Sequence, residues 1–334
     1  MSGHLERDLA DVGRRWVPDP RLGVFEVALT PGAVAGCTTS RDALTALRRL
    51  AADARRAPDI RLLPDGALGD ERAAVVTTAV APLLREPRLS AERVSEALHG
   101  ETLALLERRA GGWLRARATD GYHAWLHAGY VATGPDDWAE DWAGRATVRS
   151  LGAELRAADE RFPLALGARV APHGSDHVET ADGRVWQIGA GVVRPEGELR
   201  AEASRLAPPA WALRWFSGTP YLWGGRTAWG VDCSGLVQAT YAARGATLPR
   251  DSDLQSLMGR EVALDPLGTG YEVGDVLCFA DGHRVSHVAL WAGGGRIVHA
   301  ALSRGGVGSD DLLADTPGAQ RLRDCLVAVR RPCH

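Results

Sequence analysis

Cys233 is the residue of this sequence best placed to act as a nucleophile. It follows the glycine-rich run WGGRTAWGVD and begins a segment in which apolar residues recur at helical spacing as far as Gly245. We therefore expect Cys233 in the first turn of a helix, with Asp232 as its N-cap and the sulfur turned toward the packed face. The helix dipole and the free N–H groups lower the pKa of a thiol there, so the sequence predicts a partly ionised thiol near neutral pH. The alternative is a small buried cysteine in a packed helix.

Two histidines are candidates for the base that such a thiol needs. His287 and His299 lie in two apolar runs that flank Gly293, Gly294 and Gly295, the pattern of a β-hairpin. A loop centred on Gly293 places the two imidazoles directly opposite each other, with Cβ atoms about 5 Å apart. A two-residue loop of Gly293 and Gly294 would place them on opposite faces instead. We expect the first arrangement, which gives a base and a partner that orients it.

Two residue types are missing from the chain, and their absence excludes several mechanisms. All 39 cationic side chains other than histidine are arginine, and there is no lysine and no asparagine. Without lysine there can be no Walker-A phosphate loop, no pyridoxal Schiff base and no Ser-Lys dyad. Without asparagine the Cys-His-Asn form of a papain-type triad is impossible. A thiol catalyst here needs a third member of another type.

The composition argues against several other classes of protein. The net charge is −3, with 24% charged residues, so no strong field favours a nucleic-acid partner or an anionic membrane. We expect no metal and no cofactor. The cysteines are odd in number and contain no C-x-x-C pair, so they fit neither a disulfide framework nor a structural zinc site. They are Cys37, Cys233, Cys278, Cys325 and Cys333.

The amino terminus, MSGHLERDLADVGRRW, is charged and lacks the apolar region of a signal peptide. No run of 18 apolar residues occurs in the sequence. We therefore expect a cytoplasmic protein, or a secreted one if the amino terminus has been trimmed.

The length of the chain exceeds what one hydrophobic core organises, so several domains are expected. Residues 1–70 are predicted to form an α/β lead-in, with strands at 22–29 and 59–63 and a helix at 39–54. Residues 71–132 contain short strands separated by turn residues, which is typical of a small β-barrel.

The second half of the chain begins with a linker rich in Asp, Gly, Pro and Trp at 133–144. A weaker set of strands at 145–196 predicts a second, divergent barrel. After a predicted helix at 202–217, residues 205–334 carry the candidate thiol and histidines.

The motifs of residues 205–334 resemble the ordered motif set of the NlpC-type peptidases, papain-like enzymes that cut bacterial cell-wall peptides. The motifs are Pro220-Tyr221-x-Trp223-Gly224-Gly225, Gly230-Val231-Asp232-Cys233-Ser234-Gly235-Leu236, Leu248-Pro249-Arg250-Asp251-Ser252, Gly274-Asp275-Val276-Leu277, His287-Val288-Ala289 and Ile297-Val298-His299-Ala300.

This resemblance implies a role for each residue of the candidate site. By it, Cys233 is the nucleophile, His287 is the general base and later the general acid, and His299 orients His287. Tyr221 resembles the family's tyrosine beside the thiolate, which with the Cys233 backbone N–H could stabilise an oxyanion. Two further residues would line the substrate groove: Asp232 and Ser234.

The order of the predicted domains resembles a narrower branch of this family. The stretch GWLRARATDGYHAWL is similar to bacterial SH3-like barrels, and two such modules before the peptidase resemble the γ-D-glutamyl-L-diamino-acid endopeptidases. In that branch the first module walls off the cleft. The resemblance implies that Tyr122 and Asp251 hold the ammonium of an amino-terminal L-Ala and that Ser252 holds the substrate backbone. Glu86, in Arg85-Glu86-Pro87, is a further candidate for the ammonium.

The sequence thus predicts an α+β protein with a papain-like NlpC catalytic domain preceded by two small SH3-like β-barrels. The expected activity is hydrolysis of the γ-D-glutamyl to diamino-acid bond in murein-derived peptides with a free L-Ala, by a monomer that takes part in cell-wall peptide recycling. Two alternatives stay open: a general peptidoglycan hydrolase or amidase, and a catalytically silent wall-binding protein. The sequence does not indicate which diamino acid is accepted.

Overall fold

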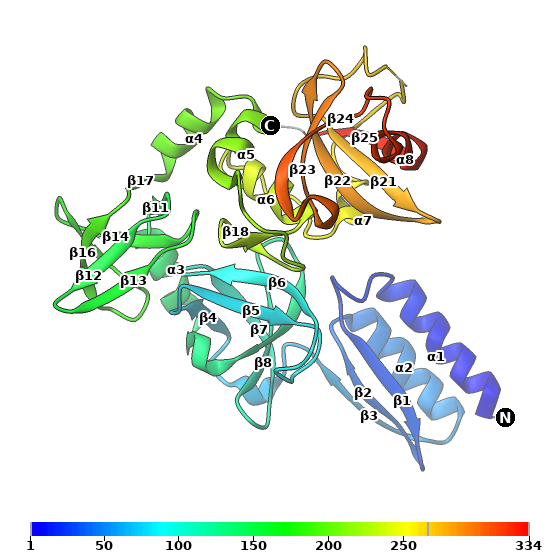
Figure 1. Cartoon of the computed structure of the whole chain (residues 1–334). Helices are drawn as coiled ribbons and strands as arrows, with labels where there is room; N and C mark the ends of the chain where they lie inside the picture. Colours follow the sequence, from blue (N-terminus) through cyan, green and yellow to red (C-terminus); the bar gives the residue numbers. More distant parts are fainter. Residues whose placement is uncertain (1, 266, 333–334) are drawn as a thin grey trace.

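The computed structural model describes residues 2–265 and 267–332 of the chain. The described residues fold into four units, with a β-sheet module lying between the other three (Figure 1). We call them the N-terminal unit (residues 2–70), the first module (73–134), the second module (148–195) and the C-terminal unit (208–331). None of the helices described is both long and apolar enough to span a membrane.

The N-terminal unit packs two helices on one face of a three-stranded sheet of order β1-β2-β3. The other face of the sheet lies toward the first module, where Cys37 packs against Leu106. The elements predicted at 22–29, 39–54 and 59–63 are confirmed within a few residues. The first helix and the second strand were not predicted, the strand because its small residues are poor strand formers. The elements are α1 (Ser2–Trp16), β1 (Phe25–Thr30), β2 (Ala33–Thr38), α2 (Arg41–Asp53), β3 (Ala57–Leu62) and η1 (Gly66–Leu68).

The first module is a seven-stranded antiparallel sheet of order β10-β4-β7-β8-β9-β5-β6. It is not the closed barrel that the sequence predicted, because β6 and β10, the two end strands, are not paired in the described residues. The edge of β6 is covered by the C-terminal unit instead, since Arg226 Nη1 donates to the Glu96 carbonyl at 2.6 Å. The elements are β4 (Ala73–Val76), β5 (Val80–Leu84), β6 (Arg93–Leu98), β7 (Thr102–Arg109), β8 (Trp113–Arg117), β9 (His123–His127), η2 (Ala128–Tyr130) and β10 (Val131–Gly134).

The second module is also an open seven-stranded sheet, of order β13-β12-β16-β15-β14-β11-β17. The predicted second set of strands is therefore present, again without closure among the described residues. Its strands are β11 (Val148–Ser150), β12 (Glu154–Ala157), β13 (Glu160–Pro163), β14 (Arg169–His173), β15 (His177–Glu179), β16 (Val185–Ala190) and β17 (Val193–Pro195).

Two segments between the units differ from their predictions. The expected linker forms α3 (Asp136–Arg145), which is held by the buried Trp142 indole donating to the Gly100 carbonyl at 3.0 Å. The single helix predicted at 202–217 is two helices, α4 (Glu196–Ser204) and α5 (Pro208–Phe216). Proline at the start of α5 disfavours the helical conformation of the residue before it, so the chain breaks there.

The C-terminal unit is built on a six-stranded antiparallel sheet of order β20-β25-β21-β22-β23-β24. Helices α5 and α6 cover one face, and α8 covers part of the other (Figure 1). The elements are β18 (Arg226–Thr227), β19 (Gly230–Val231), α6 (Cys233–Ala242), α7 (Ser252–Gln255), β20 (Arg260–Val262), β21 (Val276–Asp281), β22 (Arg284–Gly293), β23 (Arg296–Ala301), η3 (Leu302–Arg304), β24 (Gly306–Asp311), α8 (Pro317–Cys325) and β25 (Leu326–Arg331).

Candidate active site

Cys233 is the first residue of α6, as the sequence predicted. Asp232 caps the helix, because its Oδ1 accepts a hydrogen bond from the Gly235 N–H at 2.7 Å. The sulfur faces the sheet in a core that includes Val288 of β22 and Val298 of β23, and the residue is only 6% exposed. The four cysteines within the described residues carry free thiols, whereas Cys333 lies outside those residues.

The predicted ionisation of this thiol is wrong for the free protein. Burial, and after it the charge of Asp232, raise the pKa of Cys233 to about 12. Hydrogen bonds from the backbone of Val288 and Ser234 act in the opposite direction but do not offset burial. Burial also lowers the pKa of His287 to about 3. At pH 7 the thiol and the imidazole are therefore both neutral.

Asp232 also holds the loop that precedes Cys233. Its Oδ2 accepts from the Gly224 N–H at 2.9 Å, and Arg250 binds both carboxylate oxygens, at 3.0 and 2.7 Å. Arg250 is almost completely buried and also donates to Ser95 of β6 and to Ser234 Oγ, both at 2.9 Å. This bidentate pair fixes the start of α6 and ties it to the first module.

The two candidate histidines are hydrogen-bonded to each other. His287 Nε2 and His299 Nδ1 are 2.8 Å apart, and His299 is 2% exposed. A third group continues the chain, because His299 Nε2 lies 2.9 Å from Asp310 Oδ2. The other oxygen of Asp310 accepts a hydrogen bond from Arg304. A connected chain of side chains therefore runs from β22 through β23 to β24.

The register of the hairpin differs from the predicted one. Leu290 pairs with Val298, which places the histidines in diagonal rather than directly opposed positions. The register shifts between Trp291 and Gly293, so a bulge precedes the turn. Three consecutive glycines allow a bulge but do not show where it lies, so the predicted register was wrong. The offset is nevertheless even, and the two imidazoles share one face, as predicted.

The hydrogen-bond chain fixes where the imidazole protons lie. A carboxylate only accepts hydrogen bonds, so His299 Nε2 must donate to Asp310. A neutral His299 then accepts at Nδ1, and His287 Nε2 must donate to it. His287 Nδ1 is left without a proton. It is therefore the nitrogen of this histidine that can act as a base.

Two cavities meet at the site. The first has a volume of about 630 Å³ and is lined by Cys233, and the second has about 720 Å³ and is lined by His287 and His299. Tyr221 and Ser286 line both. Several predicted site residues line the first cavity: Tyr122, Tyr221, Asp232, Cys233, Ser234, Asp251 and Ser252.

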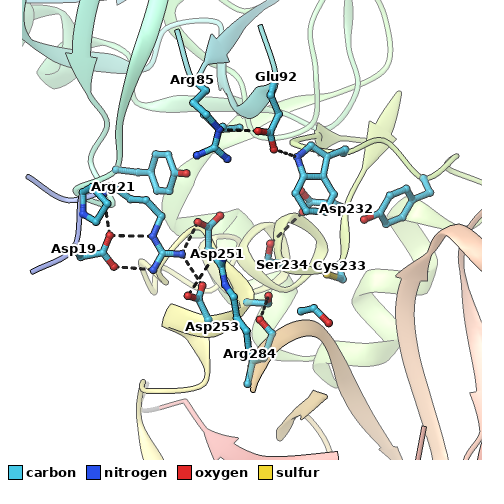
Figure 2. Close-up of a pocket in the computed structure, with 18 of the residues that line it drawn as sticks. Asp19, Arg21, Arg85, Glu92, Asp232, Cys233, Ser234, Asp251, Asp253 and Arg284 are labelled. Atoms are coloured by element: carbon cyan, nitrogen blue, oxygen red, sulfur yellow. Dashed lines mark hydrogen bonds and ion pairs between the residues drawn. The ribbon is translucent and has the colours of Figure 1, made fainter. Parts of the chain in front are cut away.

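The end of the first cavity away from Cys233 is rich in charge (Figure 2). On one side Arg85 Nε donates to Glu92 at 2.6 Å. Facing this pair, Asp251 accepts from Arg21 Nη1 at 2.9 Å. Burial raises the pKa of Asp251 and outweighs the opposing effect of the neighbouring arginines.

Glu86 is the one predicted site residue that the structure brings to neither cavity. Its side chain is 54% exposed and pairs with Arg88 at the surface. The carboxylate that lines the cavity from the same hairpin is Glu92, which also accepts from the Trp223 indole at 2.9 Å. The structure therefore places Glu86 away from the candidate site, and Glu92 of the same hairpin lines the cavity instead.

Sequence reasoning did not assign roles to three residues that complete the site. Arg250 lies in the motif Leu248-Pro249-Arg250-Asp251-Ser252, and only its buried contacts show that it holds Asp232. Asp310 was detectable in principle, since it lies two residues beyond the partner of His299 in β24 and so shares its face. Arg21 lies more than 200 residues from Asp251 and Asp253, and no local pattern connects it to them.

Comparison with known proteins gives matches in two regions of the chain. Residues 218–323 match the NlpC/P60 family, and residues 83–129 match the bacterial dipeptidyl-peptidase SH3 domain. The chain is 43% identical over 65 residues to the gamma-D-glutamyl-L-lysine dipeptidyl-peptidase of Bacillus subtilis, an alignment that covers 20% of this chain and only 21% of that protein. It is 27% identical over 226 residues to dipeptidyl-peptidase 6 of Lysinibacillus sphaericus, which covers 62% of this chain and 81% of that protein.

The fold has a close counterpart among solved structures. An NlpC/P60 family protein from Bacillus cereus superposes with a TM-score of 0.62 at 20% identity, covering 78% of this chain and 99% of that one. An NlpC/P60 endopeptidase from Photobacterium damselae gives a TM-score of 0.56 at 15% identity, covering 72% and 63%. The chain therefore carries an NlpC/P60 domain preceded by a bacterial dipeptidyl-peptidase SH3 domain.

Proposed function

We propose that the chain is a cysteine peptidase that hydrolyses the bond between γ-D-glutamate and the diamino acid in murein stem peptides with a free amino-terminal L-Ala. The observation that carries the proposal is the meeting of two cavities, one lined by Cys233 and the other by the hydrogen-bonded His287 and His299. The name of one relative supports the same bond, since it is a gamma-D-glutamyl-L-lysine dipeptidyl-peptidase.

In the proposed mechanism Cys233 attacks the γ-carbonyl carbon of D-glutamate. His287 Nδ1 accepts the thiol proton as the S–C bond forms, and the resulting imidazolium is stabilised through His299. The imidazolium then returns its proton to the amine of the diamino acid as the C–N bond breaks. Water hydrolyses the thioester, which releases the dipeptide and restores the thiol.

Neutral resting groups suit this mechanism. Because the pKa of Cys233 is raised and that of His287 is lowered, charge separation develops during attack rather than before it. The oxyanion would be stabilised by the Cys233 N–H and by the Tyr221 hydroxyl. Burial raises the pKa of Tyr221, with the charges of Cys233 and Asp232 as further causes, so the phenol keeps its proton and can donate it.

The far end of the first cavity fits an ammonium group. Tyr122 is buried there, and Asp251 offers a carboxylate whose Oδ1 accepts no hydrogen bond from the described residues. An acylated amino group would leave Asp251 Oδ1 without this cation, and a partly buried carboxylate oxygen without a donor is costly even though Oδ2 keeps its pair with Arg21.

The test compares L-Ala-γ-D-Glu-L-Lys-D-Ala with its N-acetylated form, with products identified by mass. We expect release of the L-Ala-γ-D-Glu dipeptide and a kcat/KM at least about a hundredfold higher for the free peptide, because loss of the ammonium contact at Asp251 Oδ1 should cost a few kcal/mol. Cys233→Ala should abolish turnover. Cys278→Ala, which removes another buried thiol of the same unit, should retain it.

Two results would contradict the proposal in different ways. Turnover by Cys233→Ala would exclude the thiol mechanism. Equal kcat/KM for the free and acetylated peptides would exclude free-amine specificity and favour a general wall hydrolase or amidase.

A further inference from the structure

The N-terminal unit, which lies outside both family matches, contributes to the candidate active site. The segment that connects α1 to β1 lines the cavity that contains Cys233, with four residues: Pro18, Asp19, Pro20 and Arg21. We propose that Arg21 is a specificity-determining residue, which holds Asp251 in place and closes the amine end of the substrate cleft. The inference rests on the proposed function and extends it to a part of the chain that carries no family signature.

The segment is rigid because its own contacts fix the arginine. Asp19 accepts from Arg21 Nε at 2.9 Å and from Nη2 at 2.7 Å, and its Oδ1 also accepts from the Arg21 backbone N–H at 2.9 Å. This bidentate pair leaves Nη1 directed away from the segment. Prolines on both sides of Asp19 restrict the backbone further.

The segment is also anchored to the first module. The His123 N–H donates to the Arg21 carbonyl at 2.9 Å, and His123 Nε2 lies 3.1 Å from the Gly23 carbonyl. These two hydrogen bonds to His123 of β9 fix the position of the segment relative to the first module. The position of Arg21 is thus defined from two sides, by Asp19 and by β9.

The free end of the guanidinium joins the C-terminal unit. Arg21 Nη1 donates to Asp251 Oδ2 at 2.9 Å and to Asp253 Oδ1 at 2.7 Å (Figure 2). The Arg21 side chain is 17% exposed, and its carboxylate partners are similarly covered, so these pairs are shielded from solvent. The contact fixes one oxygen of Asp251 and leaves the other facing the cavity.

The charges of this cluster favour a monocation. Three carboxylates surround Arg21, and the only further guanidinium that pairs with them among the described residues is that of Arg284, 3.4 Å from Asp253. Three negative groups and two positive ones leave one negative charge in excess. A substrate ammonium at Asp251 would neutralise it, whereas an acyl group at the same place would meet Arg21 and the prolines behind it.

The experiment measures kcat and KM of the full chain with the free tetrapeptide and its N-acetylated form. Arg21→Ala should raise KM for the free peptide about tenfold with kcat changed less than about threefold, because Arg21 acts on binding rather than on the thiol. The preference for the free over the acetylated peptide should fall about tenfold, since Asp251 loses its fixed position and the end wall opens. If Arg21→Ala does not fold, Arg21→Gln removes the same charge and should change the preference in the same direction.

Arg61→Ala is the matched control. Arg61 also joins the N-terminal unit to the first module, through Glu107 at 3.1 Å, but it does not line the cavity. It should leave the preference unchanged. An unchanged preference in the Arg21 variant, or an equal loss in Arg61→Ala, would overturn the assignment to Arg21. Failure of the proposed function is distinguishable, because the wild-type chain would then show no cleavage or no preference before any substitution.

Discussion

Asp310 determines which nitrogen of His287 can act as a base. It accepts a hydrogen bond from His299 Nε2, so His299 Nδ1 must accept one from His287 Nε2. The positions of the protons on both imidazoles are thereby set. With the carboxylate removed, His299 is free to take the opposite tautomer and donate from Nδ1 to His287 Nε2. His287 would then carry its proton on Nδ1, where a base is needed. Asp310 is therefore a positioning residue in the proposed mechanism.

Asp310→Asn tests this role. The amide can donate to His299 Nε2 and so stabilise the unproductive tautomer, and we expect kcat to fall at least about a hundredfold with KM changed little. Nitrogen NMR of the imidazoles should show the proton of His287 moved from Nε2 to Nδ1. Asp311→Asn is the control: its carboxylate accepts from the Leu313 N–H and does not contact His299, so turnover should be within about twofold of wild type. An equal effect of both substitutions would indicate a general disturbance of β24.

At the scale of the element, α6 packs so closely on the preceding loop that its first turn requires glycine. A Cβ on Gly235 would lie 2.3 Å from the Gly225 carbonyl oxygen and 3.0 Å from Asp232 Oδ1. The Gly225 backbone cannot move away from such a contact without displacing the N-cap of the helix. The glycines before and after Cys233 therefore serve to bring the loop against the helix start.

Gly235→Ala should destabilise the protein by about 1–3 kcal/mol, the usual cost of overpacking a core, although alanine is the better helix former. Gly318→Ala is the matched control at the start of α8, where an added Cβ meets nothing within 4 Å. It should leave the stability unchanged or raise it slightly. Thermal unfolding of the two variants measures the difference, and a lower melting temperature for Gly318→Ala than for Gly235→Ala would contradict the packing argument.

Local sequence patterns predicted the helix and the hairpin of the site, whereas the ionisation of the thiol and the register of the hairpin depend on packing. The cap at Asp232 and the helix after it follow from residue types within a few positions of Cys233, so the sequence predicted both. The pKa of Cys233 depends on burial by β22, which no local pattern contains, and the predicted ionisation was wrong. The shared face of His287 and His299 needed only an even offset, whereas the register depended on a bulge before Gly293.

At the scale of the whole molecule, charged and polar contacts join the C-terminal unit to the first module. Arg226 of the C-terminal unit binds Glu96 and Glu101 of the first module, and Gln238 of α6 donates to Asp120 at 2.8 Å. Such pairs have no periodicity, which is why the open sheets and the placement of the N-terminal unit at the cleft could not be predicted. The cavity that contains Cys233 is consequently lined by three units together.

His99 joins the first module to the second and makes this junction sensitive to acid. It is fully buried, with Nδ1 3.1 Å from the Thr77 carbonyl and Nε2 accepting from the Ala181 N–H at 3.2 Å. These partners require the neutral imidazole, since a proton on Nε2 would face another donor. Burial lowers the pKa of His99 to about 4, against 6.5 for the exposed side chain.

The lowered pKa determines the direction of the pH dependence. Because the folded state disfavours the charged form, the contribution of His99 to stability is fully present above pH 6.5 and is lost as pH falls toward 4, by about 2 kcal/mol at pH 5. The glutamine of His99→Gln can keep both hydrogen bonds and does not titrate. Between pH 7 and pH 5 the variant should therefore lose about 2 kcal/mol less of its free energy of unfolding than the wild type. His173→Gln, at an exposed position of the second module, should follow the wild-type curve. Denaturant unfolding at several pH values measures the three curves, and a parallel decline of wild type and His99→Gln would exclude His99 as the acid-sensitive contact between the modules.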